Sequence, residues 1–432
     1  MSPRVVIIGA GFAGYSAARG LQKYAADAEI VLINPTDYFL YLPLLPEVAA
    51  GVLEPRRICV SLPDRLPKTK LVLGTVDRID LVRRGIEWVD PERRRGGIEF
   101  DRLVLAVGSV NRLLPIPGIA EHAHGFRGIS EALYLRDHIT RQLELAAVTD
   151  DRAERDARCT FVVVGAGYTG TEVAAQGQLF TARLARQLPA LRNQQMRWLL
   201  VDLAERLLPG LNPSLSTTAD RVLRKRGVEV RTGQSVEYAS ADSLRLTTGE
   251  QVATRSLIWC VGVRPDPLVD RLSLPMEQGR IQVRETLEVP GHAHVFVCGD
   301  CAAVPDLTRP GTITGMTAQH AQRQGELVAR NVAASLAQES LAPYRHHDLG
   351  FLVDLGGLEA AADPLRIPLS GLVAKIVTRG YHLYALPGNR TRTATDWAIN
   401  TVMPPRAVQL GLVAPERVRL ESTGADLTHT QG

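Results

Sequence analysis

The hydrophobic pattern of the chain is dominated by two short, almost wholly apolar runs that each end in closely spaced glycines. Residues 5–8 are apolar and β-branched, and residues 160–164 are again mostly apolar and β-branched. A continuous apolar run of this length, bounded by glycine, predicts a strand that is buried on both faces of a parallel sheet. The pattern therefore predicts an α/β fold in which a strand leads through a glycine turn into a helix.

Both runs are followed by glycines at the spacing G-x-G-x-x-G. The first glycine allows a tight turn, the second lets a pyrophosphate approach the backbone, and the third lets the helix pack closely on the strand. One such motif is weak evidence, because glycine turns also occur for structural reasons alone. Two of them, 156 residues apart, predict two dinucleotide sites, the arrangement that a flavin needs to take hydride from a nicotinamide. They contain Gly9, Gly11 and Gly14, and then Gly165, Gly167 and Gly170.

The residue that ends the next strand normally binds the adenosine ribose. In the first half this residue is Asn34, which can hydrogen-bond a hydroxyl but adds no charge. In the second half it is Asp202, whose carboxylate would accept the 2′-hydroxyl of NADH and repel the 2′-phosphate of NADPH. NADH is therefore favoured, while the nearby Arg206 leaves NADPH open.

Further apolar runs and breaks place the other elements. We expect strands within 101–109, 257–265 and 294–300, a meander of short strands from 71 to 100, helices at 130–148 and from 171 to about 188, and a solvated linker at 149–158. Asp300 falls where a strand end meets a helix start, so its carboxylate is expected to hold a ribityl hydroxyl. Glu172 follows the second motif by two residues, where a carboxylate is also favoured by the helix dipole alone.

The chain changes character after residue 343. Strands are expected at 349–355 and 358–362, joined at Gly356 and Gly357, and an amphipathic helix follows. One face of this helix carries Leu372, Val373, Ile376, Val377 and Tyr381, whereas Lys375, Arg379 and His382 lie elsewhere on it. Between 365 and 413 the only acid is Asp396, against the bases Arg366, Lys375, Arg379, Arg390, Arg392 and Arg406. Such a segment predicts contact with a membrane surface, with a docking or dimer surface as the alternative.

Composition narrows the class of protein. A chain of 432 residues should form two or three domains, and its 45% hydrophobic and 22% charged residues are ordinary for a globular protein. The net charge of +4 does not suggest a nucleic-acid partner. Five scattered cysteines favour a reducing compartment, and packing is favoured over redox chemistry for Cys298 and Cys301. His346 and His347 lack the accompanying ligands of a metal site, and neither a signal peptide nor a membrane span is expected.

Six stretches together resemble the type II NADH dehydrogenases (NADH:quinone oxidoreductases), and the resemblance runs from about residue 4 to 413. They are PLLPEVAAG (43–51), VVVGAGYTGTEVA (162–174), VDLAERLLPGL (201–211), LIWCVGVRPDPL (257–268), VFVCGDCA (295–302) and TAQHAQRQG (317–325). The resemblance implies a non-proton-pumping enzyme that passes hydride from NADH to FAD and two electrons to a quinone. It also implies two Rossmann-like domains of the two-dinucleotide-fold flavoprotein type and a small C-terminal membrane or dimer-contact region.

The implied domains are an FAD domain (1–118 and 288–342), an NADH domain (119–287) and a C-terminal region (343–432), in a cytoplasmic protein peripheral to the inner face of the cell membrane. The implied catalytic residues are Glu172, which positions nicotinamide or relays a proton, and Gln319 at the quinone entrance. The expected FAD residues are Gly9, Gly11, Phe12, Ala13, Gly14, Asn34, Val76, Ala106, Gly108, Gly299, Asp300, Ala318 and Gln319. The expected NADH residues are Gly165, Gly167, Tyr168, Thr169, Gly170, Glu172, Asp202 and Gly262.

Two positions depart from the family pattern. Asn34 replaces the ribose carboxylate, and Arg323 replaces the second glutamine of the A-Q-x-A-x-Q pattern, where a cation favours a different acceptor or stabilises an anionic reduced flavin or quinol. Two other functions therefore stay open. One is a soluble NAD(P)H-dependent flavoprotein reductase that serves ferredoxin or another acceptor, and the other is a flavoprotein that senses NADH.

Overall fold

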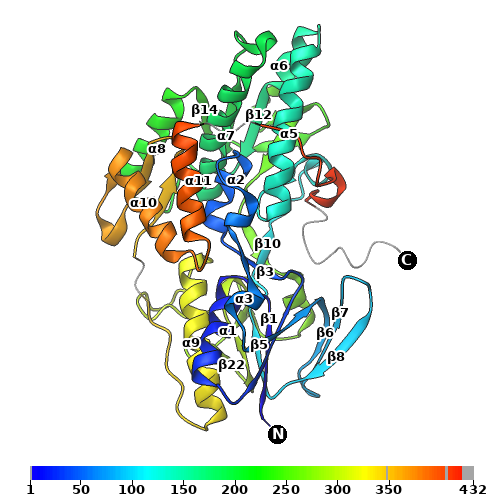
Figure 1. The fold of residues 1–432 in the computed structure, drawn as a ribbon, viewed down its shortest axis with the longest axis vertical. Coiled ribbons are helices and arrows are strands. Elements are labelled where there is room, and N and C mark those ends of the chain that lie inside the picture. Colours follow the sequence, from blue (N-terminus) through cyan, green and yellow to red (C-terminus); the bar gives the residue numbers. More distant parts are fainter. Residues whose placement is uncertain (1, 347–348, 404–406, 421–432) are drawn as a thin grey trace. The chain divides into compact units, whose positions relative to one another are not determined.

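The computed structural model describes residues 2–346, 349–403 and 407–420, and it contains two compact units (Figure 1). Unit 1 consists of Met1–Leu40, Cys59–Val110 and Val263–Asp348. Unit 2 consists of Tyr41–Ile58, Asn111–Gly262 and Leu349–Gly432. Each unit contains one of the two glycine motifs. Residues 41–58 and the C-terminal segment belong to unit 2, and residues 263–287 belong to unit 1. The functional domains proposed from the sequence stay a prediction.

Unit 1 is built on a six-stranded sheet with β1 near its centre. The strand order is β22-β23-β9-β1-β2-β5, and every neighbouring pair is parallel except β22 with β23. Val5, Val6 and Ile7 are fully buried, because both faces of the sheet are covered. Their hydrophobic run is therefore continuous, whereas a strand with one solvent-exposed face would alternate apolar and polar residues. The strands are β1 (Arg4–Ile8), β2 (Glu29–Asn34), β5 (Thr69–Leu73), β9 (Arg102–Leu105), β22 (Glu288–Val289) and β23 (His292–Val297).

Two helices of unit 1 pack against each other at unusually short range. Helix α1 (Phe12–Tyr24) follows the first glycine motif, and α9 (Ala318–Leu336) lies beside it (Figure 1). A Cβ on Gly325 would lie 2.1 Å from the carbonyl oxygen of Ala13, so only glycine allows this approach. The contact fixes the beginning of α9 relative to the first glycine turn.

Unit 2 repeats the arrangement with a five-stranded parallel sheet in the order β11-β18-β12-β13-β14. Val164, at the end of β12, pairs with Val201 and Trp259, just as Ile8 of β1 pairs with Ile33 and Leu105. The predicted α/β fold with two dinucleotide-binding motifs is confirmed. The strands are β11 (His124–Gly125), β12 (Thr160–Val164), β13 (Arg197–Asp202), β14 (Val228–Thr232) and β18 (Ser256–Trp259), and the longer helices are α5 (Ile129–Val148), α7 (Tyr168–Gln187) and α8 (Pro213–Lys225).

The remaining elements are short. They include the predicted meander β6 (Thr75–Asp80), β7 (Gly85–Val89) and β8 (Arg95–Glu99) in unit 1, and a second meander, β15 (Val236–Ala239), β16 (Ser243–Leu246) and β17 (Gln251–Ala253), in unit 2. The others are β3 (Tyr38–Leu40), α2 (Leu45–Ala49), β4 (Cys59–Ser61), α3 (Leu62–Arg65), β10 (Ser109–Asn111), α4 (Ile119–His122), β19 (Val263–Pro265), β20 (Met276–Glu277), β21 (Arg280–Gln282) and β24 (Ala302–Ala303).

The C-terminal part of unit 2 contains a three-stranded sheet and two helices. The predicted hairpin at Gly356 is confirmed, because β25 (Leu352–Asp354) pairs antiparallel with β26 (Ala360–Ala362), and β27 (Leu369–Ser370) follows. The helices are α10 (Gly371–Ala385) and α11 (Arg390–Val402).

The predicted linker at 149–158 was wrong, since Arg152–Arg158 forms helix α6. Asp151 caps the helix by accepting a 2.9 Å hydrogen bond from the N–H of Ala153, and Glu154 pairs with Arg158 one turn later at 2.7 Å. Caps and i,i+4 ion pairs stabilise a polar helix that hydrophobic periodicity does not reveal.

Helix α10 is amphipathic as predicted, but its polar face is the buried one. Lys375 is 3% exposed, whereas Leu372 is 54% and Ile376 is 64% exposed. Arg379 is also half-buried, with its guanidinium over the Trp397 ring at 4.8 Å. Lys375 and Arg379 therefore add little exposed positive charge to the segment for which membrane contact is predicted, and Arg406 lies outside the described residues.

Candidate functional site

The first glycine turn has the geometry of a phosphate cradle. Gly9 has φ +94°, in the left-handed region, and a Cβ there would lie 2.5 Å from the carbonyl oxygen of Ala106. A Cβ on Gly14 would lie 1.8 Å from the carbonyl oxygen of Gly9, so α1 packs closely on the turn. A Cβ on Gly11, in contrast, would meet no atom within 4 Å. The space in front of Gly11 is open at the N-terminus of α1, where backbone N–H groups attract phosphate.

The second turn repeats this geometry in unit 2. Gly165 has φ +103° and approaches the carbonyl oxygen of Cys260, and a Cβ on Gly170 would lie 1.8 Å from the carbonyl oxygen of Gly165. A Cβ on Gly167 would again meet no atom within 4 Å. Helix α7 begins at Tyr168, three residues earlier than expected, so Tyr168 and Thr169 lie in its first turn.

Asn34 ends β2 and Asp202 ends β13, and each side chain accepts a hydrogen bond from a backbone N–H of the neighbouring glycine turn. Asn34 Oδ1 accepts a 2.8 Å hydrogen bond from the N–H of Ala10, inside the first glycine turn. Asp202 Oδ2 accepts from the N–H of Ala166, inside the second turn, and its Oδ1 accepts from Ala204 at 2.7 Å. Asn34 also donates through Nδ2 to Thr36. Each turn is thus tied to the end of the neighbouring strand, and a carboxylate has lone pairs left for a ribose hydroxyl.

Asp300 belongs to a network in unit 1 that extends to α9. Ser109 Oγ donates to Asp300 Oδ2, and the N–H of Gly299 donates to Gln324 Oε1 at 2.8 Å. Gln324 Nε2 in turn donates to Thr314 Oγ1 at 3.0 Å. Gly299 has φ +78°, a conformation that favours glycine. The network fixes the short turn that carries Asp300, next to the strand β23 that pairs with β9.

The other expected cofactor residues lie after strands or at the start of a helix in their own units, apart from Val76, which lies within a strand. In unit 1, Phe12 and Ala13 begin α1, Val76 is buried on β6, and Ala106 and Gly108 follow β9. In unit 2, Gly262 follows β18 with φ +69°. Backbone at the carboxyl ends of parallel strands is the usual place of a dinucleotide in such folds.

Glu172 lies in a buried cluster of ionisable side chains in unit 2. Its Oε1 accepts a 2.8 Å hydrogen bond from the N–H of Asp354, on β25. Asp354 forms an ion pair with Lys375, whose Nζ lies 2.6 Å from Oδ1 and 2.5 Å from Oδ2, and it also accepts from Gln176 Nε2 at 3.2 Å. Glu47, on α2, accepts from Trp397 Nε1. Four segments that are distant in sequence therefore meet around Glu172.

Burial controls the protonation of this cluster. It raises the pKa of Glu172 well above its usual value, and the charges of Asp354 and Glu47 raise it further. Burial likewise raises the pKa of Glu47 to about 7, with Asp354 adding to the shift and Lys375 opposing it. His382, which hydrogen-bonds Tyr41 at 3.1 Å, has its pKa lowered to about 4, chiefly by burial. The cluster can hold a proton on a carboxylate at neutral pH.

Gln319 lies in the first turn of α9, in unit 1, directly after Ala318. Its Oε1 lies 2.6 Å from His346 Nε2, and Arg323 Nη1 donates to its backbone carbonyl at 3.2 Å. His320 Nδ1 forms a 2.8 Å hydrogen bond with the hydroxyl of Tyr344. Two imidazoles and a guanidinium therefore surround the position expected to line the acceptor entrance, and His347 lies outside the described residues.

The Cys298–Cys301 pair is buried, and both thiols are free. Burial raises the pKa of Cys298 well above its usual value and that of Cys301 to about 12. The thiolate is the reactive form, so these thiols favour packing over redox exchange.

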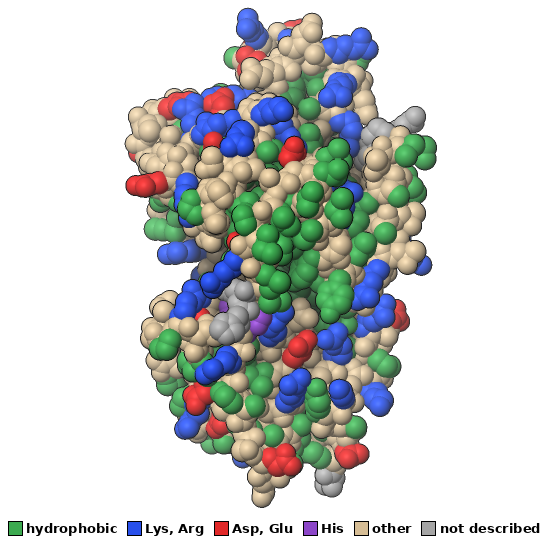
Figure 2. Space-filling view, turned by 90° about the vertical axis from the view of Figure 1, so that its left-hand side faces the viewer, with side chains coloured by type: hydrophobic (Ala, Val, Ile, Leu, Met, Phe, Trp, Pro, Cys, Tyr) green, Lys and Arg blue, Asp and Glu red, His purple; other side chains and the backbone are tan. Residues whose placement is uncertain are grey.

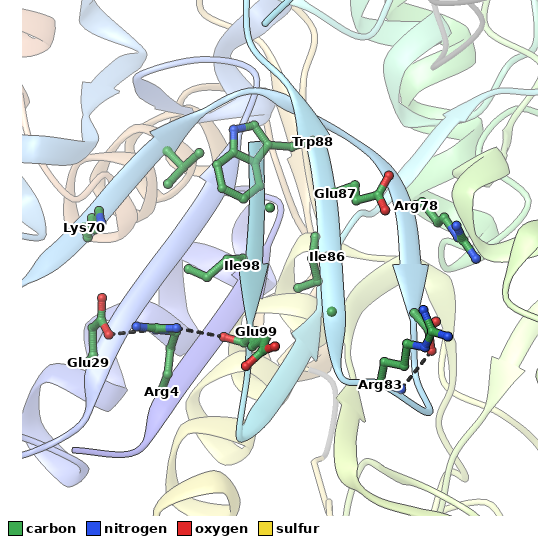
Figure 3. A pocket seen from close by; sticks show the side chains of 14 residues that line it. Arg4, Glu29, Lys70, Arg78, Arg83, Ile86, Glu87, Trp88, Ile98 and Glu99 are labelled. Atoms are coloured by element: carbon green, nitrogen blue, oxygen red, sulfur yellow. Dashed lines mark hydrogen bonds and ion pairs between the residues drawn. The ribbon is translucent and has the colours of Figure 1, made fainter. Parts of the chain in front are cut away.

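Unit 1 contains a groove of about 730 Å³, lined by residues of β1, β2 and β5 and of the β6–β8 meander and lying outside the first glycine turn (Figure 3). Trp88, Ile86 and Ile98 form apolar patches in it, and Arg4 is paired with Glu29 at 2.7 Å. Its four basic side chains are matched by four acidic ones, so the groove favours neither an anion nor a cation. They are Arg4, Lys70, Arg78 and Arg83, with Glu29, Asp80, Glu87 and Glu99.

Sequence reasoning missed Glu47, Asp354 and the buried role of Lys375. The only local signals are an acid inside the apolar stretch PLLPEVAAG and a lysine on the polar side of an amphipathic helix. Gln324 and His346 were also missed as partners, since their contacts join positions that periodicity does not connect. Among the described residues no group of side chains is arranged to hold a metal ion.

Comparison with known proteins agrees with this geometry. Residues 3–325 match the family model of the pyridine nucleotide-disulphide oxidoreductases. The type II NADH:quinone oxidoreductase NdhA of Mycobacterium tuberculosis is 32% identical over 416 residues, covering 91% of this chain and 86% of that protein. The demethylphylloquinone reductase NdbB of Synechocystis is 28% identical over 396 residues, covering 89% of this chain and 92% of that protein.

A solved structure has a similar fold. NDH2 from Plasmodium falciparum, in complex with NADH, superimposes with a TM-score of 0.87 at 17% identity, covering 94% of this chain and all of that one. With a relative above 30% identity across most of its length and a family model across three quarters of it, the chain belongs to the type II NADH:quinone oxidoreductases within the pyridine nucleotide-disulphide oxidoreductase family.

Proposed function

We propose that this chain is an FAD-dependent NADH:quinone oxidoreductase, in which NADH, one proton and a quinone become NAD⁺ and a quinol. The observation that carries the proposal is the duplicated turn, with open space in front of Gly11 in unit 1 and Gly167 in unit 2. A side chain at either position would fill the space that a pyrophosphate needs. Two such cradles in a member of this family support one flavin dinucleotide and one nicotinamide dinucleotide.

FAD is assigned to unit 1 and NADH to unit 2. The first turn would hold the FAD pyrophosphate, and Asp300, fixed by Ser109 and by the Gln324 network, would accept a ribityl hydroxyl. Bound FAD would supply the hydride and electron chemistry, while the chain supplies orientation and electrostatics.

NADH is the proposed donor rather than NADPH. Asp202 offers a carboxylate at the end of β13, where it would accept a ribose 2′-hydroxyl and repel a 2′-phosphate. Arg206 donates instead to the carbonyls of Pro209, at 2.6 Å, and Leu211, at 3.0 Å. Its guanidinium stabilises its own loop through these hydrogen bonds, which argues against binding of a 2′-phosphate by Arg206.

Glu172 is proposed to hold and release the proton that the reaction consumes. Burial raises the pKa of Glu172 well above its usual value, which favours the protonated form, and its contact with the backbone of Asp354 connects it to the Lys375 ion pair. A carboxyl group whose pKa is raised by burial suits general acid–base work near pH 7.

The exposed apolar face of α10 is proposed to rest on a membrane surface. Leu372, Val373 and Ile376 are exposed on this helix, and hydrophobic side chains gather into a patch bordered by Lys and Arg in Figure 2. Transfer of these apolar side chains from water into the lipid interface would be favourable, and it would contribute to the free energy of membrane binding. None of the described helices is long and apolar enough to cross a membrane. The membrane surface to which α10 binds is proposed to be the inner face of the cell membrane. The alternative is that the same patch forms a homodimer contact.

A quinone is favoured over ferredoxin as the acceptor. NdhA and NdbB, which cover most of this chain, are both named for quinone substrates. A ferredoxin reductase from Rhodopseudomonas palustris shares the fold with a TM-score of 0.66 at 20% identity, and this likeness shows the architecture alone.

The proposal is tested by following the two half-reactions separately in a stopped-flow instrument. NADH should bleach the flavin absorbance without oxygen, and menadione should restore it within milliseconds to seconds, whereas reduced protein mixed with oxidised ferredoxin should stay bleached. Acid treatment should release FAD. Protein that carries no flavin, or reduced protein that menadione does not reoxidise, would contradict the proposal.

Membrane contact is tested by flotation with vesicles containing anionic lipid. Wild type should float with the vesicles at low salt, and a Leu372→Ser/Ile376→Ser variant should stay in solution while its flavin is still reduced by NADH. If wild type remains in solution and forms a dimer that the same variant abolishes, the patch is a subunit interface.

A further inference from the structure

The first turn of α9 and the segment that follows the helix form a connected side-chain group in unit 1. Gln319 Oε1 lies 2.6 Å from His346 Nε2, and His320 Nδ1 lies 2.8 Å from the Tyr344 hydroxyl. The rings of His320 and His346 meet edge to face with centroids 5.6 Å apart. These contacts connect Gln319, at the proposed acceptor entrance, to His346, which lies 27 positions later in the sequence.

The segment that carries His346 is held in place by its backbone. Asn331 Nδ2 donates to the carbonyl of Ala342 at 2.8 Å, and the N–H of Ala342 donates back to Asn331 Oδ1 at 2.9 Å. The N–H of Tyr344 donates to the carbonyl of Glu285 at 2.7 Å. Tyr344 and His320 are both 3% exposed. His346 therefore reaches Gln319 from a fixed stretch of backbone.

The hydrogen bond decides which way the Gln319 amide points. Its oxygen accepts from the N–H at His346 Nε2, so its N–H₂ group is directed to the opposite side of the amide carbon. A protonated imidazole has only donors and permits only this orientation. Thr317 caps α9 by accepting from the N–H of His320 at 3.2 Å, which fixes the turn under Gln319. His346 thus presents Gln319 as a hydrogen-bond donor.

We propose that His346 is a positioning residue that holds the Gln319 amide with its N–H₂ toward a carbonyl oxygen of the electron acceptor. This inference rests on the proposed function, since it assigns Gln319 to the acceptor entrance. A quinone carbonyl is the matching ligand, because it accepts hydrogen bonds and gains negative charge on reduction. Arg323, one helical turn from Gln319, adds a cation on the same face of α9. The site therefore selects acceptors with an exposed carbonyl oxygen.

Three variants separate this role from a general packing role. His346→Leu removes the donor, whereas His346→Gln keeps an N–H₂ group at a similar reach. Gln319→Leu removes the group on which His346 is proposed to act. We expect His346→Leu to raise the KM for menadione about tenfold with kcat changed less than threefold, and His346→Gln to restore most of the affinity. The rate of flavin reduction by NADH should match wild type in both His346 variants.

A double-mutant cycle supplies the decisive comparison. In the Gln319→Leu background, His346→Leu should have no further effect on the menadione KM, because its action passes through the amide. Quenching of protein fluorescence by menadione, without NADH, should give the same pattern in binding affinity. Equal KM and binding affinity in wild type and His346→Leu, or equal losses in both backgrounds, would overturn the inference. Failure of menadione to reoxidise reduced wild type would instead contradict the proposed function itself.

Discussion

The backbone N–H of Ala10 donates to Asn34 Oδ1 at 2.8 Å, in the same way that the N–H of Ala166 donates to Asp202. An amide and a carboxylate thus serve as equivalent ties between a glycine turn and the next strand. The difference between them is the negative charge, which only Asp202 carries. Its observed structural role and its proposed role in ribose binding can therefore be separated by substitution.

Asp202→Asn should keep the turn intact, as Asn34 does in the first half, and lower the preference for NADH over NADPH about tenfold. Loss of the charge weakens the bond to a 2′-hydroxyl and removes the repulsion of a 2′-phosphate. The measurement is kcat/KM for both donors. Asp202→Ala should also lose thermal stability, because the N–H groups of Ala166 and Ala204 lose their acceptor at about 1–3 kcal/mol each. Wild type that uses both donors equally would contradict this assignment.

Gly11→Ala should give a folded protein with little flavin. The φ of Gly11 is −70°, which alanine adopts, and its Cβ meets no protein atom, yet the methyl group fills the cradle. Gly167→Ala is the matched variant, with φ −72°, and should keep its flavin while the KM for NADH rises about tenfold. Flavin content is measured from the absorbance after acid release, with circular dichroism as the control for folding. Full flavin content in Gly11→Ala would place FAD elsewhere.

Glu47→Gln should flatten the pH dependence of stability. Because the folded state raises the pKa of Glu47 from 4.5 to about 7, the folded state binds more protons than the unfolded state between these values. Stability due to Glu47 is therefore full below pH 4.5 and falls as pH rises to 7, by an amount on the order of 3 kcal/mol. Glutamine keeps an acceptor for Trp397 Nε1 without this loss.

The measurement is the thermal unfolding midpoint of wild type and Glu47→Gln at pH 5 and pH 8. The variant should lose less stability than wild type over that interval, and it should be the more stable protein at pH 8. An identical decrease in both proteins would mean that another group dominates the pH dependence.

Arg323→Gln restores the family glutamine and should change the choice of acceptor. With the guanidinium removed, the kcat/KM for the anionic 2-hydroxy-1,4-naphthoquinone should fall relative to that for neutral menadione, by about threefold to tenfold. High salt should shrink the same ratio in wild type, because the interaction is electrostatic and Arg323 is only half-buried. A ratio unaffected by both changes would place the cation away from the acceptor.

Local rules were enough to predict the parts of the molecule that local chemistry determines. The runs at 5–8 and 160–164, the two glycine motifs and the hairpin at Gly356 follow from neighbouring residues alone. The Glu172 cluster could not be predicted in this way, since Glu47, Asp354 and Lys375 come from separate segments. Helix α10 shows the limit most plainly, because periodicity identifies two faces and does not say which one is inside.

In α10 the residues required for folding and the residues available for contact are different sets. Lys375, Thr378 and His382 are buried, whereas Leu372, Val373 and Ile376 contribute little to the interior of their unit. In most amphipathic helices the apolar face packs in the protein interior. Polar substitutions on that face therefore destabilise the fold. Here the apolar side chains can be exchanged for polar ones at small cost in stability, so a few substitutions can remove surface contact by α10 while the unit stays folded.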